Sequence, residues 1–486
     1  MSLKAKLTMI LIMLLGGFFG LLNETLLTTA LPSVMRTFNI EYTQVQWLTT
    51  AFLLANGVVI PLSAMIIQRY TTRQVFLVAI GIFFVGTIIA GFSSTFTVLL
   101  VARIVQALGS GIMMPLMMTT MLDIFEPHER GKYMGIFGLV IMLAPAIGPT
   151  LSGYLVEYFN WRSLFHVVAP IAAITFLLAL KFVKNVGTNR KVPIDILSII
   201  LSVFGFGGLL YGTSSISRDG WDDPIVLTTV IGGLILVILF IYRQTKLETP
   251  LLNFSVFANK QFAVGLTIMA FTMISMIGSE TILPMFVQNI MDKPALESGL
   301  ILLPGALVMG VMSIVGGILF EKFGAKVLGL VGMLIVIITT SYFVFMDGDS
   351  SVIVLATVYA IRMIGLALGL MPLMTHTMNQ LKPELNAHGS SMTNTVQQIS
   401  ASIGTAVLIT IMSHVAQQFK PTMSDYKGLD KKAMAAQIQH DALLSGYHGA
   451  FVFAVIISII SFLSVFMLKG KKQADRDAAQ NRAKTQ

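Results

Sequence analysis

The chain has 486 residues, of which 55% are hydrophobic and only 11% are charged. Soluble domains carry about 25% charged residues, so this composition excludes an ordinary soluble enzyme and indicates a polytopic membrane protein. The formal net charge is +9, but the basic residues fall in short loops rather than on one face, so no nucleic-acid partner is expected. Cysteine is absent, which excludes disulfides, thiolate nucleophiles and cysteine metal sites.

Apolar segments of about 19–28 residues recur along the chain, each long enough to cross about 30 Å of hydrocarbon as a helix. Fourteen are predicted, at 7–31, 45–67, 75–94, 97–122, 134–156, 164–183, 194–213, 225–243, 261–288, 298–320, 326–346, 352–379, 390–415 and 449–468. The first follows Lys4 and Lys6 but has no small-residue cleavage pattern, so it is interpreted as an uncleaved helix. The predicted fold class is all-α.

The basic residues predict the orientation of these helices. With the N-terminus inside, the cytoplasmic loops and tail hold Lys4, Lys6, Arg69, Arg73, Arg130, Lys132, Lys181, Lys184, Arg190, Lys191, Arg243, Lys246, Lys322, Lys326, Lys469, Lys471, Lys472, Arg476, Arg482 and Lys484. The short outer loops carry far fewer, which favours the cell membrane as location with both termini cytoplasmic. The polar outer loop at about 416–447 is an exception, because it contains Lys427, Lys431 and Lys432.

An internal repeat relates the two ends of the chain. Glu24 and Glu280 lie in similar apolar surroundings, 256 residues apart. Three other pairs keep nearly that offset: Met114-Pro115 with Met371-Pro372, Ile147-Gly148 with Ile403-Gly404, and Gln68-Arg69 with Glu321-Lys322. Single short matches arise by chance, but four in near register favour two homologous six-helix bundles. The predicted domains are 1–185, two inserted helices at 186–250, 251–470, and a basic cytoplasmic tail at 471–486.

Two six-helix halves are the plan of a transporter that works by alternating access, with its site between the halves. A carboxylate in the membrane costs roughly 2.5–3.5 kcal/mol, so Glu24 and Glu280 are functional candidates. A desolvated glutamate can hold a proton or a cationic substrate in turn, which is antiport. The alternative is a protonated glutamate that only packs. The repeat predicts that both glutamates lie in the outer half of the membrane and face one shared cavity.

Several motifs resemble those of a known family. The segment 134–156 contains Gly138, Ala144, Pro145, Gly148, Pro149 and Gly153 in an order that resembles the antiporter motif of drug exporters in the major facilitator superfamily. Arg103 opens a stretch, 103–111, similar to that family's Arg-x-x-Gln-Gly-x-Gly element. The resemblance is to the fourteen-helix drug:proton antiporter branch (EmrB/QacA type) and covers essentially the whole chain. It implies a monomer without cofactor, driven by the proton gradient, with drugs, protons and membrane lipid as partners.

The chain departs from the family pattern at two places. Many relatives have an aspartate where this chain has Asn23, and the acid follows at Glu24, which turns the side chain by about 100° around the helix. The loop after 45–67 keeps Arg69 and Arg73 but has lost its glycine and aspartate positions. The second copy keeps the pattern better, with Glu321, Lys322 and Gly324. The resemblance implies that this loop gates the cytoplasmic side, so any such latch is expected to depend on the second half.

The remaining candidates each have a structural alternative. Small residues and prolines in 134–156 favour a bent, tightly packed helix that acts as a hinge or seal, although ordinary helix packing uses the same residues. A buried Arg103 needs a partner or water; the resemblance links it to proton coupling, and the alternative is a tie to backbone carbonyls. Arg362, its rough counterpart, is interpreted as structural. Asp123, Glu126 and Glu129 are expected to pair with Arg69, Arg73 or Arg130.

The sequence favours transport over other functions. Proton-coupled export of amphipathic or cationic drugs is the primary prediction, and a dedicated small-molecule exporter or lipid flippase of the same fold is the alternative. An intramembrane enzyme would need an acid/base or nucleophile cluster facing one leaflet, and the sequence has none. The seven histidines show no metal-ligand spacing, and no glycine loop predicts nucleotide hydrolysis.

Overall fold

The computed structural model describes residues 1–27, 30–187, 193–421 and 430–470. Within these ranges the regular structure is helical. The elements are α1 (Leu3–Leu26), α2 (Leu31–Phe38), α3 (Tyr42–Val45), α4 (Trp47–Arg69), α5 (Thr72–Gly91), α6 (Phe96–Ile124), α7 (Arg130–Tyr158), α8 (Ser163–Phe182), α9 (Ile196–Asp219), α10 (Pro224–Lys246), η2 (Phe254–Ala258), α11 (Lys260–Asn289), α12 (Ala295–Phe343), α13 (Val352–Asn379), η3 (Pro383–Leu385), α14 (Asn386–Gln417) and α15 (Lys431–Val465).

Thirteen of the described helices are long and apolar enough to cross a membrane. One of them, α12, has 49 residues and is interrupted at Gly324, whose φ of 77° and ψ of 166° are not helical. A positive φ is accessible to glycine because it has no Cβ. Gly324 therefore divides α12 into two crossing segments, which correspond to the two segments predicted at 298–320 and 326–346. The all-α polytopic membrane fold is confirmed.

Among the helix boundaries that differ from the prediction, two have clear local reasons. The first helix ends at Leu26 rather than 31, and Pro32 occupies the first turn of the new helix α2. Proline fits the first turn because its missing N–H has no helical partner there. The last helix begins at Lys431, well before 449, because the side chain of Asp430 caps it by accepting from the Ala433 N–H at 2.7 Å.

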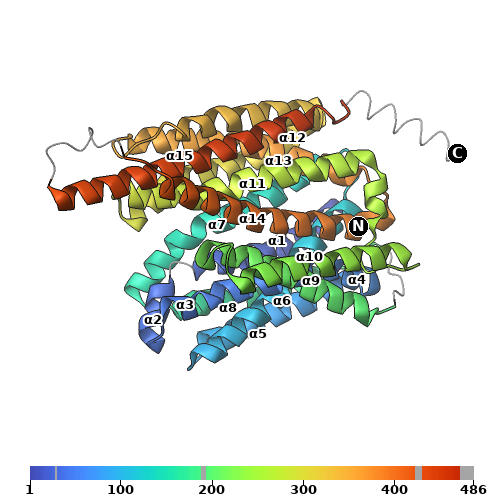
Figure 1. Cartoon of the computed structure of the whole chain (residues 1–486). Helices are drawn as coiled ribbons and strands as arrows, with labels where there is room; N and C mark the ends of the chain where they lie inside the picture. Colours follow the sequence, from blue (N-terminus) through green and yellow to red (C-terminus); the bar gives the residue numbers. More distant parts are fainter. Residues whose placement is uncertain (28–29, 188–192, 422–429, 471–486) are drawn as a thin grey trace.

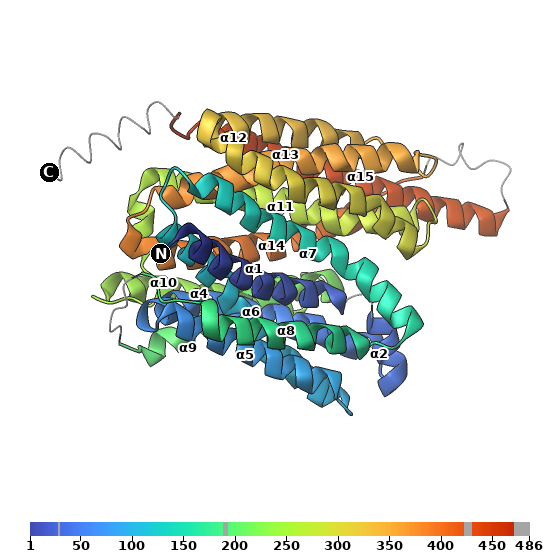
Figure 2. The same ribbon diagram turned by 180° about the vertical axis from the view of Figure 1, so that it is seen from behind.

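The spanning helices form two layers (Figure 1). Helices α11 to α15 make up one layer, and α1 to α10 make up the other, with α7 running obliquely between them when the molecule is seen from behind (Figure 2). The boundaries predicted between the domains, at 185/186 and 250/251, stay predictions. The predicted tail, 471–486, lies outside the described residues.

Two seams join the layers. In the first, α7 packs against α12, and Gly131 and Gly317 bring the two backbones so close that an added Cβ at either would overlap the other chain segment. In the second, α4 packs against α14, and the buried hydroxyls of Ser63 and Ser391 form a hydrogen bond of 2.7 Å. Small residues permit close helix packing in lipid, so both seams are built for tight contact.

The two helices of the predicted insert, α9 and α10, form a pair that packs on itself through Gly208 and Gly233. At the end of the pair, Arg243 binds Asp195 through two hydrogen bonds of 2.8 and 2.9 Å. The Arg243 hydrogen bond lowers the pKa of Asp195, which precedes α9, to about 2. Helix α9 also packs against α4 of one layer and α14 of the other, so the insert touches both.

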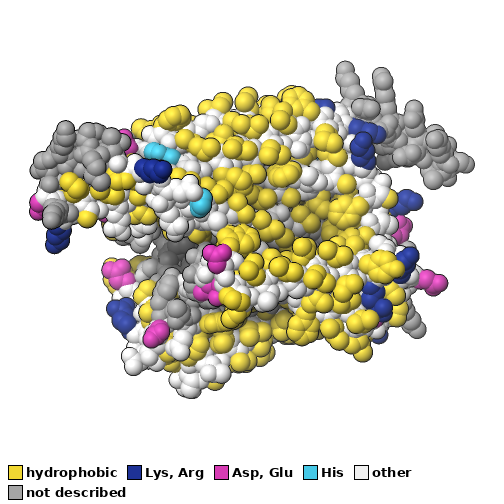
Figure 3. Space-filling view, viewed as in Figure 1, with side chains coloured by type: hydrophobic (Ala, Val, Ile, Leu, Met, Phe, Trp, Pro, Cys, Tyr) yellow, Lys and Arg dark blue, Asp and Glu magenta, His cyan; other side chains and the backbone are white. Residues whose placement is uncertain are grey.

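The surface has the pattern expected in a membrane. Hydrophobic side chains cover most of the face between the two ends of the molecule, and charged side chains gather near those ends (Figure 3). This apolar belt lies over the long helices seen in the same view of Figure 1. The chain is therefore a multi-pass membrane protein, since such a surface is stable against hydrocarbon rather than water.

Candidate functional site

Arg103 on α6 is fully buried and is the centre of a polar network in the first layer. Its guanidinium donates to the backbone oxygen of Asn23 at 3.1 Å, to Gln106 Oε1 at 3.1 Å and, through Nε, to the backbone oxygen of Leu48 at 3.5 Å. The ring of Phe52 lies 4.1 Å from the guanidinium carbon, close enough for a cation–π interaction. Three helices thus hold the arginine in place.

Glu24 on α1 lies near enough to Arg103 for the two charges to attract each other. Its carboxyl lines a pocket of about 340 Å³ whose other walls come from α4, α9, α11 and α14. Neither polar atom of the buried Asn23 amide has a hydrogen-bond partner, and Nη2 of Arg103 also lacks one. These free polar atoms give the site capacity to bind water or a polar ligand group.

The second layer contains a comparable pair. Arg362 on α13 is fully buried, donates from Nη2 to the backbone oxygen of Ser275 at 3.0 Å, and donates from Nε to Thr340 Oγ1 at 3.1 Å. Glu280 on α11 interacts electrostatically with this arginine. The carboxyl lines a pocket of about 180 Å³ beside the buried Tyr359. Arg362 is therefore the counterpart of Arg103 in the site as well as in the repeat.

The two glutamates line separate pockets. The prediction from the repeat, that they face one shared cavity, is therefore wrong. Helix α11 lies between their pockets, because Met276 lines the pocket of Glu280 and the adjacent Ile277 lines the pocket of Glu24. Successive residues on a helix point about 100° apart, so one helix presents a face to each pocket. The structure therefore has two candidate sites, one at each glutamate.

The antiporter motif on α7 reaches toward both sites. Pro145 lines the Glu280 pocket. Gly148 packs against Thr25, the residue after Glu24, and a Cβ at this glycine would overlap the threonine side chain. Ala144 is fully buried, whereas Gly153 faces open space. Pro149 belongs to α7, but its side chain lies outside the described residues. The motif is thus in contact with the surroundings of both glutamates.

The predicted gating residues divide between the layers. Arg73 donates to the backbone oxygen of Leu180 at 2.5 Å and ties α5 to α8 within the first layer. Arg69 lies 5.8 Å from the ring of Tyr70. Glu321 lies beside the seam, since its Cγ is 3.3 Å from the position of an added Cβ at Gly131. Its neighbour Lys322 is exposed, and Gly324 forms the kink of α12. Of these residues, the glutamate of the second copy is placed to act across the seam.

Other polar contacts close the seam at the end where α1 begins. Arg130 of α7 donates to Asn379 Oδ1 at 2.8 Å, and Asn386 donates to Asp123 Oδ1 at 2.9 Å. The sequence predicts that Asp123 pairs with an arginine. Arg130 does attract the Asp123 carboxylate electrostatically, but the hydrogen bond to this carboxylate comes from Asn386. These bonds join the layers because Asn379 and Asn386 belong to the second one.

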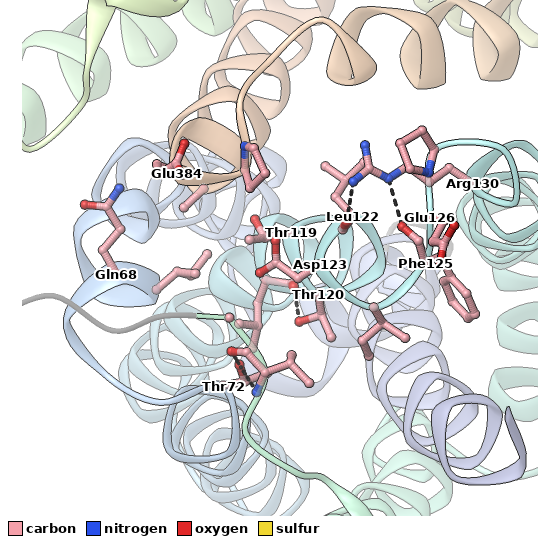
Figure 4. A pocket seen from close by; sticks show the side chains of 18 residues that line it. Gln68, Thr72, Thr119, Thr120, Leu122, Asp123, Phe125, Glu126, Arg130 and Glu384 are labelled. Atoms are coloured by element: carbon pink, nitrogen blue, oxygen red, sulfur yellow. Dashed lines mark hydrogen bonds between the residues drawn. The ribbon is translucent and has the colours of Figure 1, made fainter. Parts of the chain in front are cut away.

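A polar cavity of about 470 Å³ lies beside these contacts (Figure 4). Its lining includes Asp123, Glu126 and Arg130 from the α6–α7 turn and Glu384 from the second layer. Figure 4 shows Arg130 donating to the backbone oxygens of Leu122 and Phe125. The cavity does not include Glu24 or Glu280, so it is a vestibule at one end of the seam rather than part of either candidate site.

Sequence reasoning missed the polar partners of the two arginines. Gln106 accepts a hydrogen bond from Arg103 and donates one from Nε2 to Thr87 Oγ1 on α5 at 2.8 Å. Thr340, the direct partner of Arg362, lies 253 residues after Thr87. That offset equals the one between the two loop motifs, so a search for polar residues that follow the repeat would have found this pair.

Two layers of long helices, joined by packed seams and containing buried charge pairs, define a multi-pass protein of the transporter type. The family model described as Major Facilitator Superfamily matches residues 13–405. The chain therefore belongs to the Major Facilitator Superfamily.

Several curated relatives match over most of their length. An uncharacterized MFS-type transporter, YcnB of Bacillus subtilis, is 45% identical over 94% of this chain and 94% of its own. The lincomycin resistance protein LmrB of Listeria innocua is 39% identical over 94% and 96%. The multidrug transporter protein MdtP of Bacillus subtilis is 31% identical over 83% and 74%. The human organic anion transporter MFSD10 has the same fold, with a TM-score of 0.63 at 14% identity over 95% of this chain and 99% of its own.

Proposed function

We propose that the chain is a proton-coupled antiporter that exports amphipathic, often cationic, small molecules across the cell membrane. Both termini are cytoplasmic in this proposal, and the transporter acts as a monomer that needs no cofactor besides the proton gradient. The names of relatives such as LmrB and MdtP support a drug as the exported compound.

The observation that carries the proposal is the duplicated pair of a glutamate and a buried arginine. Each glutamate lines a pocket, and each is close to an arginine that is held by backbone oxygens. A carboxyl in such a position is neutral when protonated and negative when the proton leaves, so it can exchange a proton for a cationic substrate. Glu24 and Glu280 are the proposed carriers, with Arg103 and Arg362 setting their charge balance.

The seam contacts support a cycle of alternating access. Hydrogen bonds close the seam beside the vestibule, at the end assigned to the cytoplasm, and the pockets of the glutamates lie farther along the helices. Rocking of the layers would break these bonds and open the pockets to the cytoplasm. The antiporter motif on α7 would transmit the movement between the two sites.

The test is uptake of a fluorescent cation such as ethidium into inside-out membrane vesicles with an acidic lumen. Wild type is compared with Glu24→Gln and Glu280→Gln, which remove the titratable oxygen while keeping the shape. Glu248→Gln serves as control, because Glu248 is exposed in the loop after α10. We expect each site variant to lose gradient-driven uptake and the control to keep it.

Full uptake in both site variants would show that the glutamates do not couple transport to protons. Lincomycin is included as a second substrate because it distinguishes a dedicated exporter from a broad one. Saturable transport of lincomycin without transport of ethidium would support the dedicated exporter.

A further inference from the structure

The inserted helix α9 lies across one of the two seams between the layers. Its Leu210 packs on Gly57 of α4, where a Cβ would overlap the leucine side chain. On its other side, Thr213 Oγ1 lies 2.6 Å from Ser402 Oγ of α14. Helix α9 therefore touches α4 of the first layer with one side and α14 of the second layer with the other.

Two aromatic contacts hold the far end of α9 in the same position. Tyr211 stacks on Trp47 at the start of α4, with ring centroids 5.8 Å apart and planes 20° from parallel. Trp221, just after α9, donates from its indole nitrogen to Thr410 of α14 at 2.8 Å. Each layer thus contributes one fixed point, and the helix spans the seam between them.

This position makes α9 one wall of the Glu24 pocket. Leu210, Thr213 and Ser214 line that pocket together with Glu24 of α1 and with residues of α4, α11 and α14. The pocket lies along the seam between α4 and α14, on which α9 packs. Helix α9 therefore forms the side of the pocket that bridges α4 and α14.

The chemistry of the wall is mixed. Thr213 and Ser214 present hydroxyl groups, and their protons are used within the protein: Ser214 donates to Tyr211 O at 3.0 Å, and Thr213 donates to Leu209 O at 2.7 Å. Both hydroxyls add polar atoms to the wall, and the Thr213 oxygen also meets Ser402 Oγ of α14. Leu210 adds an apolar surface. In the lining of the pocket, Glu24 is the residue that carries a charge.

We propose that helix α9 is a substrate-selecting wall of the Glu24 pocket, and that Leu210, Thr213 and Ser214 determine which amphipathic cations bind there. This inference rests on the proposed function, because Glu24 is taken as the partner of the cation. A pocket of about 340 Å³ holds one small molecule, with its cationic group at Glu24 and its apolar body against α9 and α4. A bulkier residue on α9 would then discriminate against larger cations.

The first measurement compares transport of methyltriphenylphosphonium and the larger tetraphenylphosphonium in the same vesicles. Ser214→Phe fills space at the exposed position 214, and we expect it to change the ratio of the two half-saturating concentrations by about tenfold, since one misfitting group in a pocket is worth about 10–200-fold. Ile235→Phe on α10 is the control, because Ile235 is 52% exposed and is not part of the pocket. The control should keep the wild-type ratio.

The second measurement needs no transport. The chain has no cysteine, so Ser214→Cys introduces one thiol without background. We expect tetraphenylphosphonium to slow its alkylation by N-ethylmaleimide in proteoliposomes about tenfold at saturation, and to have no effect on Ile235→Cys. Adding Glu24→Gln to Ser214→Cys should abolish the protection, because the cation then loses its partner.

The outcomes separate the two proposals. If Glu24→Gln abolishes transport but position 214 neither changes the ratio nor is protected, α9 is only a structural helix and the inference is wrong. If position 214 is protected in a Glu24-dependent way while Glu24→Gln still transports cations with the gradient, α9 is a ligand-binding wall and the coupling proposal is wrong.

Discussion

Arg103 and Arg362 occupy comparable places in the two layers, but their surroundings differ. Arg103 donates to the backbone oxygens of two other helices and to Gln106, and it lies against the ring of Phe52. Arg362 donates to one backbone oxygen and to one hydroxyl. The first arginine is therefore held more firmly, although both are fully buried.

The pockets of the two glutamates also differ, both in volume and in the helices that line them. Glu24 faces a pocket of about 340 Å³ that includes α9, and Glu280 faces one of about 180 Å³ bounded by α7 of the first layer and by α11, α12 and α13 of the second. A glutamate and a buried arginine thus occur in both layers, but their surroundings differ. We infer that the two sites have different tasks, with substrate contact favoured at Glu24 and the smaller Glu280 pocket better suited to a proton.

The largest effect is expected where the antiporter motif meets the first site. Gly148→Leu would force a side chain into Thr25, and overpacking of this kind costs about 1–3 kcal/mol. Since 1.4 kcal/mol corresponds to tenfold in an equilibrium, proton-driven ethidium uptake should fall about tenfold or more. Gly232→Leu is the matched control, because Gly232 on α10 faces open space and belongs to neither the motif nor the pockets. Equal uptake by the two variants would show that the contact of α7 with Thr25 does not contribute to transport.

A smaller effect should distinguish the two arginines. Lysine keeps the charge but cannot reproduce the guanidinium fork, so Arg103→Lys loses about two hydrogen bonds and Arg362→Lys about one. A net hydrogen bond contributes about 1 kcal/mol, which predicts destabilisation of roughly 2 and 1 kcal/mol. Thermal unfolding of the purified proteins in detergent measures the difference. A larger loss for Arg362→Lys would reverse the comparison.

The smallest expected effect concerns the side-chain link from Arg103 through Gln106 to Thr87 in the first layer. Gln106→Met keeps the length of the side chain but removes the amide that joins Arg103 to Thr87. Thr87 still donates to the Phe83 backbone oxygen, and Arg103 still has Asn23, so the variant should lose only about 1 kcal/mol and keep its transport. The readout is the melting temperature together with ethidium uptake. Complete loss of uptake would show that Gln106 takes part directly in coupling transport to protons.

Much of the fold could be predicted because a membrane helix is a local property of the sequence. About 20 apolar residues must form a helix in hydrocarbon, whatever surrounds them. The two segments of α12 were found in this way even though one helix runs through both, with a break at Gly324. The boundaries at Leu26 and Lys431 were missed because they depend on a proline and on an aspartate cap, which are weak signals beside an apolar pattern.

The apolar segments, the repeated motifs and the costly carboxylate in each half could be recognised in the amino-acid sequence alone. The packed fold was needed to see that Glu24 and Glu280 have separate pockets, that Arg362 is as deeply buried as Arg103, and that α9 forms one wall of the first pocket. The cost of burying a charge follows from the residue and its apolar neighbours, whereas a pocket is made by helices far apart in the chain, and its shape depends on how their side chains pack.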